Sequence, residues 1–193
     1  MRKYVYPGWL IIALALGCSG PRSFVHPSTD IGFYQKIGVV TFRNLTQDRF
    51  AGQKMTSTFI TELLLAKKFE VAEPGEFDQI VREVRQAASS SEEQELSAEQ
   101  VKIVGDKAQV QGVIEGEVKE FQMTRIGSED FPLISVTVKL VDVPSGQVVW
   151  MTSHTAKGGP KFPIFSFGET RTLGELAQKV CKKLVQEFIN QAF

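Results

Sequence analysis

Between residues 110 and 155 apolar and polar side chains alternate, and this pattern constrains the fold more than any other feature of the chain. The alternation fills 110–121 and again 134–140, and after a tight turn at 144–146 it returns over 147–155. A period of two is typical of a β-strand with one buried and one solvated face. The segment therefore predicts three consecutive strands that form a meander with one face against a core.

The rest of the chain from residue 36 onward divides into helical patterns and short apolar runs. The predicted helices begin at residues 50, 74, 97 and 173. The predicted additional strands occupy 36–42 and 69–72. The order is strand, helix, strand, helix, helix, three strands, helix (β-α-β-α-α-β-β-β-α). This order predicts an α/β fold in which helices pack on a mixed sheet of about five strands.

Two of the predicted helices carry specific local signals. In the first helix, an apolar face repeats every four residues, with two further apolar residues beside it: Ala51, Met55, Phe59 and Leu63, flanked by Ile60 and Leu64. Such spacing indicates a helix that buries one side. At the start of the third helix, Ser97 is followed three residues later by Gln100, which resembles a capping box.

The first eighteen residues resemble a secretory signal. Residues 1–3 supply two positive charges, 8–16 are apolar, and Gly17 is followed by Cys18. The apolar run is shorter than the roughly 20 residues that span a bilayer, so 1–17 is predicted to be a signal peptide. The end of the run resembles a bacterial lipobox, which implies cleavage before Cys18 and acylation of its thiol with lipid such as palmitate. The alternative is an ordinary cleaved signal that leaves a soluble periplasmic protein.

The residues after the signal divide into a tether and a domain. The segment 18–35 is rich in Gly, Pro and Ser, which favours a lipid-anchored flexible tether. The residue after Cys18 is Ser19 and not Asp. In enterobacterial lipoproteins this pattern resembles the one that directs sorting to the outer membrane. Residues 36–193 are predicted to form a single α/β domain. We therefore expect a protein that is lipid-anchored on the periplasmic face of the bacterial outer membrane.

The charge balance excludes one class of partner. The chain has 22 basic and 22 acidic residues and no long basic block. Binding to nucleic acid or to a membrane through charge alone needs a concentrated basic surface. We therefore expect no nucleic-acid partner, and we expect attachment to the membrane to depend on the lipid at Cys18.

Few side chains could build an active site. No His or Cys lies at metal-ligand spacing from His154. Cys181 falls within the apolar face of the last helix and is expected to be buried. Glu115 and Glu117 share a strand face with Lys119, which favours a solvated sheet face over a pair of catalytic carboxylates. We expect no catalysis, no cofactor and no bound metal.

Three segments together resemble a family of bacterial envelope lipoproteins. The strand and turn at 37–46 end in Phe-x-Asn-x-Thr, 61–74 combines a helix end with a short strand, and 135–150 is a late hairpin. These segments are similar to lipoproteins related to the curli secretion component CsgG, to LpoB-type activators of penicillin-binding proteins and to the TolB amino-terminal domain. The resemblance covers 36–193 and implies a non-catalytic αβ binding or assembly module in the periplasm.

The resemblance leaves more than one role open. The leading hypothesis is an outer-membrane-anchored module that binds another envelope protein and regulates it, with a penicillin-binding protein as a candidate partner. The alternative is a homo-oligomeric subunit of a CsgG-like secretion or envelope ring assembly, although the insertions at 124–131 and 157–167 are shorter than membrane-spanning hairpins. An envelope hydrolase is a third class. The short tether at 18–35 argues against a reach across the whole periplasm.

One segment is the leading candidate for a partner contact. Apolar side chains crowd the segment 157–168, and the candidate contact residues are Phe162, Ile164, Phe165 and Phe167. The apolar side chains of such a loop either pack against their own domain or contact a partner protein, and both interpretations stay open. Arg125, with Ile126 in the opposite hairpin, is a second candidate. The partner itself is not identified by the sequence.

Overall fold

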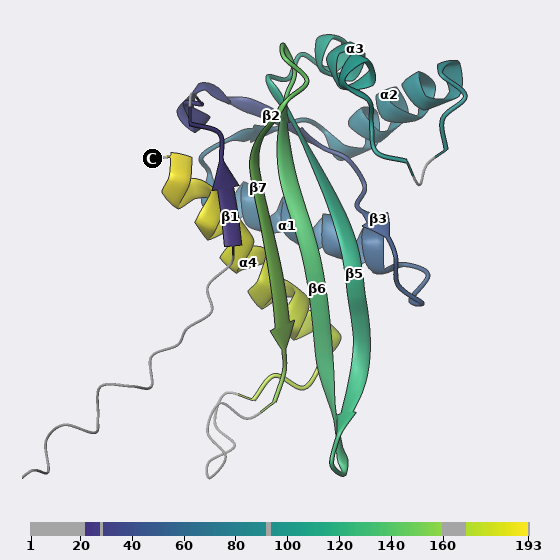
Figure 1. Cartoon of the computed structure of the whole chain (residues 1–193), viewed down its shortest axis with the longest axis vertical. Helices are drawn as coiled ribbons and strands as arrows, with labels where there is room; N and C mark the ends of the chain where they lie inside the picture. Colours follow the sequence, from purple (N-terminus) through teal and green to yellow (C-terminus); the bar gives the residue numbers. More distant parts are fainter. Residues whose placement is uncertain (1–21, 28, 92–93, 160–168, 193) are drawn as a thin grey trace, which may run out of the picture.

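A mixed sheet of seven strands forms the framework of the protein (Figure 1). The computed structural model describes residues 22–27, 29–91, 94–159 and 169–192. The order across the sheet is β1-β7-β6-β5-β2-β4, and β3 pairs with β5. The strands are β1 (Arg22–Val25), β2 (Lys36–Val39), β3 (Arg43–Asn44), β4 (Glu70–Val71), β5 (Gly112–Ile126), β6 (Glu129–Asp142) and β7 (Val148–Lys157). The predicted α/β class is confirmed, and β1 and β3 add to the five strands that were expected.

The β5–β6 hairpin is longer than the alternating pattern predicts. Its two strands pair antiparallel as far as Ile126 and Glu129, so the segment 124–131 belongs to the hairpin and is not an insertion between shorter strands. Gly127 has a φ of +64° at the turn, a conformation that glycine adopts without a steric cost. The backbone hydrogen bonds between β5 and β6 continue past the residues whose side chains alternate in polarity.

Helices α1 (Ala51–Ala66) and α4 (Leu173–Ala192) pack on one face of the sheet, and the end of the β5–β6 hairpin extends beyond them (Figure 1). The predicted apolar face of α1 is buried there, since Met55, Phe59 and Leu63 have no exposed area, whereas Leu64 is 56% exposed. The indole of Trp150 packs against Phe188 of α4 with ring centroids 4.7 Å apart. This layer forms the main hydrophobic core.

Helices α2 (Pro74–Ala87) and α3 (Ala98–Ala108) pack on the opposite face, at one end of the sheet (Figure 1). Their buried side chains meet a smaller cluster that includes Val113 of β5. The predicted capping box is present at the start of α3: Ser97 Oγ accepts from Gln100 N, and Gln100 Oε1 accepts from Ser97 N. Because these helices cover only one end, the remainder of this face is open.

Part of the segment predicted as a flexible tether, among its described residues 22–27 and 29–35, packs against the sheet and the core. Strand β1 pairs antiparallel with β7, and Ile31 and Tyr34 are 2% and 3% exposed. The hydroxyl of Tyr34 donates to Asp142 Oδ1 at 3.0 Å, and burial together with this bond raises the pKa of Tyr34. The tether prediction is therefore wrong for these residues, because the edge of β7 can bind any extended segment that reaches it.

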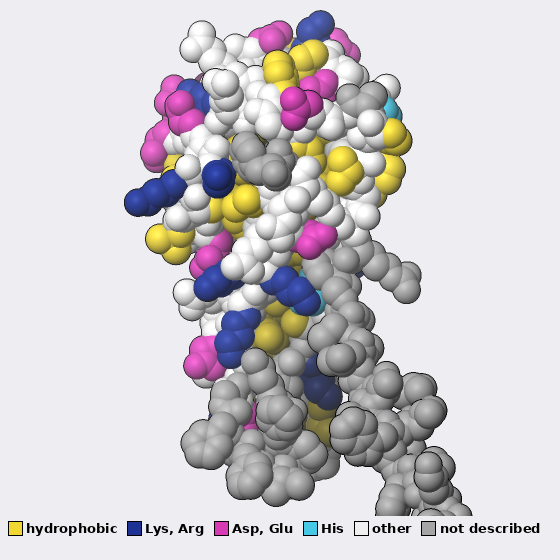
Figure 2. All heavy atoms as spheres, turned by 90° about the vertical axis from the view of Figure 1, so that its left-hand side faces the viewer, with side chains coloured by type: hydrophobic (Ala, Val, Ile, Leu, Met, Phe, Trp, Pro, Cys, Tyr) yellow, Lys and Arg dark blue, Asp and Glu magenta, His cyan; other side chains and the backbone are white. Residues whose placement is uncertain are grey.

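The outer side of α4 and the edge strand β1 form another face of the molecule, seen in Figure 2. Lys and Arg side chains lie scattered among uncharged ones on this face and do not form one block. Helix α4 carries Lys179, Lys182 and Lys183, of which Lys179 and Lys182 are exposed. In the part of the chain that the structure describes, no helix is both long and apolar enough to cross a bilayer.

Candidate functional site

The open part of the sheet carries polar side chains on three adjacent strands. Hydroxyl groups of β6 and β7 pair across the strands, Ser135 with Thr155 and Thr137 with Ser153, each at 2.8 Å. Next to them, a hollow of about 90 Å³ lies between these strands and the loop that joins α2 to α3. Charged residues line this hollow, Lys119 among them, and we call the six others the charged cluster: Arg43, Arg85, Glu95, Glu115, Glu117 and Lys139.

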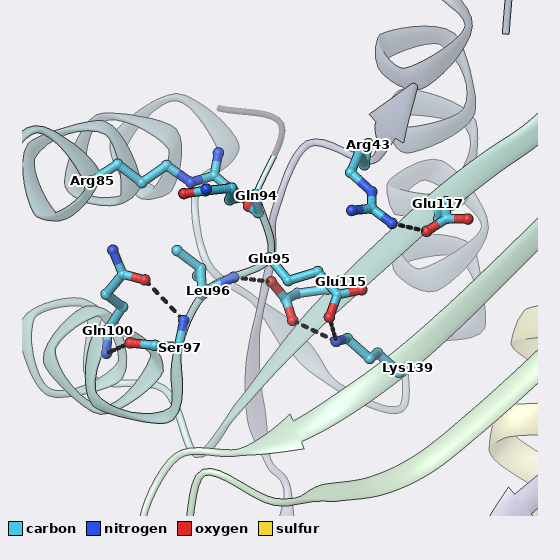
Figure 3. Close-up of polar contacts among 10 residues, drawn as sticks. All are labelled: Arg43, Arg85, Gln94, Glu95, Leu96, Ser97, Gln100, Glu115, Glu117 and Lys139. Atoms are coloured by element: carbon cyan, nitrogen blue, oxygen red, sulfur yellow. Dashed lines mark hydrogen bonds and ion pairs between the residues drawn. The ribbon is translucent and has the colours of Figure 1, made fainter. Parts of the chain in front are cut away.

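Lys139 is at the centre of the charged cluster (Figure 3). Its Nζ lies 2.8 Å from Glu95 Oε2 and 3.2 Å from Glu115 Oε2. Glu115 Oε1 accepts a hydrogen bond from Leu96 N at 3.0 Å, which attaches the α2–α3 loop to β5. The Glu115 side chain is only 8% exposed. The prediction of a solvated sheet face is wrong for Glu115, because a loop distant in the sequence folds over it.

The contacts of Lys139 shift two pKa values. The hydrogen bond from Lys139 lowers the pKa of Glu95 below its ordinary value of 4.5. Burial by itself would lower the pKa of Lys139, but the hydrogen bond to Glu95 and the charge of Glu115 outweigh it, so the pKa is raised above 10.5. Both groups are therefore charged over the whole physiological range of pH.

The two arginines of the charged cluster come from different elements, Arg85 from α2 and Arg43 from β3 (Figure 3). The guanidinium of Arg43, on β3, donates to Glu117 on β5, and this bond raises the pKa of Arg43. From α2, Arg85 donates through its Nη2 to the carbonyl oxygen of Gln94 at 2.9 Å. The Nε of Arg85 is buried without a hydrogen-bond acceptor among the described residues.

A larger cleft of about 430 Å³ adjoins the charged cluster at the end of β2. Strand β2 leads into α1 on one face of the sheet, and β4 leads into α2 on the other, so the cleft lies where the chain direction diverges. Crevices at such switch points are the usual ligand sites of open α/β sheets. Four of the lining residues are arginines, and we call this the arginine cleft: Arg43, Arg49, Arg82 and Arg85, with Asp78 as its one acidic lining residue.

The candidate residues predicted from the sequence are placed only in part. Cys18, Phe162, Ile164, Phe165 and Phe167 lie outside the described residues. Arg125 is exposed near the end of the β5–β6 hairpin.

The hairpin end is close to the described ends of the aromatic segment. Lys157 pairs with Leu133 of β6, Gly159 forms a bridge with Thr170, and Gly159 lies beside Phe131. Arg125 pairs with Asp130, the residue that precedes Phe131. The described ends of the aromatic segment therefore lie beside the β5–β6 hairpin at one end of the sheet.

The remaining reactive side chains lie in the core or at its margin. Cys181 is fully buried, and burial followed by the nearby charge of Glu62 raises its pKa to about 12. Burial, together with the charge of Lys183, lowers the pKa of His154. Among the described residues, no group of His, Cys, Asp or Glu side chains is arranged to hold a metal ion. The arrangement offers charged and hydrogen-bonding surfaces for binding.

The arginine cleft and the charged cluster were not anticipated from the sequence. The arginines lie on two separate elements, β3 and α2, and in the loop that precedes α1, and no local pattern links all of them. One signal was present: Arg82 and Arg85 are three residues apart on α2, which places them on the same side of a helix. Their meeting with Arg43 and Arg49 depends on the packing of α2 against the end of β2.

Solved structures share this fold at low sequence identity. The PelC dodecamer from Paraburkholderia phytofirmans is similar with a TM-score of 0.57 and 20% identity, over 87% of this chain and 95% of that one. The lipoprotein GNA1162 from Neisseria meningitidis has a TM-score of 0.54 and 17% identity, over 80% of this chain and 98% of its own. At such identities the likeness concerns the fold. Among curated proteins, none matches the sequence.

A family match identifies the chain more closely. Residues 31–155 match the model of the family described as peptidoglycan-synthase activator LpoB, which covers β2 to β6 and most of β7. Because this family activates a synthase and is not the synthase, the prediction that the chain is no enzyme is confirmed. The resemblance to LpoB-type activators of the cell envelope is confirmed as well. The chain belongs to the peptidoglycan-synthase activator LpoB family.

Proposed function

We propose that this protein is an outer-membrane-anchored periplasmic lipoprotein that binds a peptidoglycan synthase of the penicillin-binding type and raises its activity. The observation that carries the proposal is the match of residues 31–155 to the LpoB family. The signal-like residues 1–17 and Cys18 support export and a lipid anchor. A non-catalytic domain that has charged and aromatic surfaces suits a regulator that acts by contact.

For the contact surface we propose the end of the sheet that carries Arg125 and the ends of segment 157–168. Four residues of that segment remain the proposed apolar contacts, three of them aromatic: Phe162, Ile164, Phe165 and Phe167. Aromatic and arginine side chains carry much of the binding energy at protein interfaces. The closeness of the described ends of this segment to the β5–β6 hairpin supports a single contact surface and not two separate ones.

A ring assembly was the other hypothesis from the sequence. The description of PelC names a dodecamer, but the 20% identity relates that protein to this chain by fold alone. We therefore do not extend the dodecamer to this chain.

The proposal is tested by measuring glycan polymerisation by a penicillin-binding protein purified from the same organism, with and without the full chain in detergent. We expect the chain to raise the rate. Phe165→Ala should reduce this stimulation and leave thermal unfolding nearly unchanged. The matched control is Phe33→Ala, because Phe33 is 57% exposed and lies outside the proposed surface.

A second measurement tests the anchor. Crosslinked pull-downs from membranes should recover the synthase with the native chain and recover less of it with Cys18→Ser, which is exported without lipid. Recovery of the chain alone as a large ring, with no effect on any synthase, would contradict the proposed function.

A further inference from the structure

The arginine cleft concentrates positive charge in a protein that has none in excess. The whole chain has equal numbers of basic and acidic residues, yet four arginines and one aspartate line this cleft. Like charges gathered in a concave surface repel one another and focus an attractive field for anions. A cluster of this kind is unfavourable for the free protein unless an anionic group compensates it.

Compensation from within the chain reaches only part of the cleft. Arg43 forms an ion pair with Glu117. No carboxylate of the described residues lies within ion-pair distance of Arg49, Arg82 or Arg85. The buried Nε of Arg85 lacks an acceptor within the same set of residues. Within the described part of the chain, Arg49 and Arg82 thus have no internal carboxylate partner, and Arg85 is held only by its bond to the carbonyl oxygen of Gln94.

The positions of these groups indicate the shape of that ligand. Arg82 and Arg85 are neighbours on α2, and Arg49 precedes α1 on the other wall of the cleft. A single small anion accepts from one or two guanidinium groups, whereas a peptide with several carboxylates can pair with both walls. The volume of about 430 Å³ fits a short peptide segment.

Carboxylates are the partners that arginines already have elsewhere in this protein. Arg171 forms an ion pair with Glu169 at 2.6 Å, and Arg43 forms one with Glu117. The planar guanidinium matches a carboxylate with two parallel hydrogen bonds, which a lysine cannot reproduce. On α4, by contrast, the exposed basic residues Lys179 and Lys182 are lysines.

We propose that the arginine cleft binds an acidic segment of another protein, whose Asp or Glu carboxylates pair with Arg49, Arg82 and Arg85. This site lies apart from the contact surface proposed above and does not depend on the identity of the synthase. It is a second recognition site on the same domain. Its affinity depends on ionic strength because the arginines line an open cleft.

The test measures binding of a fluorescein-labelled octaglutamate to the full chain in detergent by fluorescence anisotropy, with labelled octaserine as the neutral control. Arg49→Glu and Arg82→Glu should each weaken binding by about tenfold or more, since each replaces an attraction with a repulsion. Lys102→Glu is the matched control, because Lys102 is exposed on α3 and gives the same change in net charge. It should weaken binding by less than about twofold.

Arg49 and Arg82 are exposed, so their variants should unfold at the wild-type temperature. Arg82→Gln should weaken octaglutamate binding by less than Arg82→Glu does. Because glutamine carries no negative charge, a loss in this variant cannot be caused by repulsion. Equal losses in Lys102→Glu and Arg82→Glu would overturn the proposal in favour of net charge alone. Absence of octaglutamate binding would also overturn it, as would complete displacement by an equal concentration of inorganic phosphate.

The outcome is independent of the proposed function. If octaglutamate binds with the expected pattern while the chain stimulates no synthase, the arginine cleft is supported and the synthase role fails. If synthase stimulation is intact and octaglutamate does not bind, the reverse holds.

Discussion

Glu115 and Lys139 are directly opposite one another on β5 and β6, and their side chains meet at 3.2 Å beneath the α2–α3 loop. Lys139 also pairs with Glu95 in that loop, and Glu115 accepts from the backbone of Leu96. The pair therefore joins two strands to a loop that has almost no apolar residues of its own. This relationship makes the charged cluster a clamp that holds the loop on the open sheet face.

Removal of the Glu115 carboxylate should weaken the clamp. Glu115→Ala leaves the largely buried ammonium of Lys139 and the amide of Leu96 with fewer partners, and should lower the free energy of unfolding by about 2–4 kcal/mol. Glu115→Gln keeps an acceptor for Leu96 and should cost less. Urea denaturation measures both, with Glu120→Ala on the same strand as the half-exposed control. Equal stability of Glu115→Ala and Glu120→Ala would contradict the clamp.

The clamp also predicts how stability depends on pH. The pKa of Glu95 is lowered in the folded state, so its contribution is present above the unfolded value and is lost as the pH falls through the folded pKa. The pKa of Lys139 is raised, so its contribution is present below the unfolded value and is lost as the pH rises through the folded pKa. Lys139→Met should flatten both limbs of a urea-midpoint profile. An unchanged profile would show that the pair does not contribute.

Cys181 should be inert in the folded protein. Its pKa of about 12 and its lack of exposed area leave almost no accessible thiolate at neutral pH. In a Cys18→Ser background, a thiol reagent should label Cys181 only after denaturant is added. Ser57→Cys supplies an exposed thiol on α1 as the positive control. Native labelling of Cys181 at the rate of that control would contradict its burial.

Gly38 permits the close packing of α2 on β2. A Cβ atom at this position would lie 2.1 Å from Cε2 of Phe77. Gly38→Ala should therefore lower the free energy of unfolding by about 3 kcal/mol, since the ring has to move within a packed cluster. Gly75→Ala is the control, because a Cβ there meets nothing within 4 Å, and it should change stability by less than about 1 kcal/mol. Thermal and urea unfolding of the two variants measure these changes, and equal stability of Gly38→Ala and Gly75→Ala would contradict the close packing at Gly38.

Local patterns predicted most of the elements because both periodicity and capping are properties of neighbouring residues. Met55, Phe59 and Leu63 were expected on one helix face and are buried together. Leu64, in the same pattern, is exposed, since the packed side of α1 is narrower than the apolar stripe. The strand β1 was missed because its partner, β7, follows it by more than a hundred residues.

The candidate sites were harder to predict for the same physical reason. The alternation along β5 predicts that Glu115 is solvated. The α2–α3 loop shields its side chain from water, and the amide of Leu96 in that loop donates a hydrogen bond to it. Arg43 and Arg85 are far apart in the sequence and meet because β3 and α2 flank the end of β2. An ion pair or a cleft depends on distances between elements, which no local spacing encodes.

By itself, the sequence determined the α/β class, the order of the long elements, the burial of Cys181 and the resemblance to LpoB-type activators. These follow from periodicity and from motifs whose residues lie close together in the chain. The tertiary structure alone decided that residues 22–25 join the sheet, that Glu115 and Lys139 clamp a loop, and that four arginines share one cleft. Strand register and helix packing bring those groups together, because hydrogen-bond pairing and core contacts act between segments that are distant in sequence.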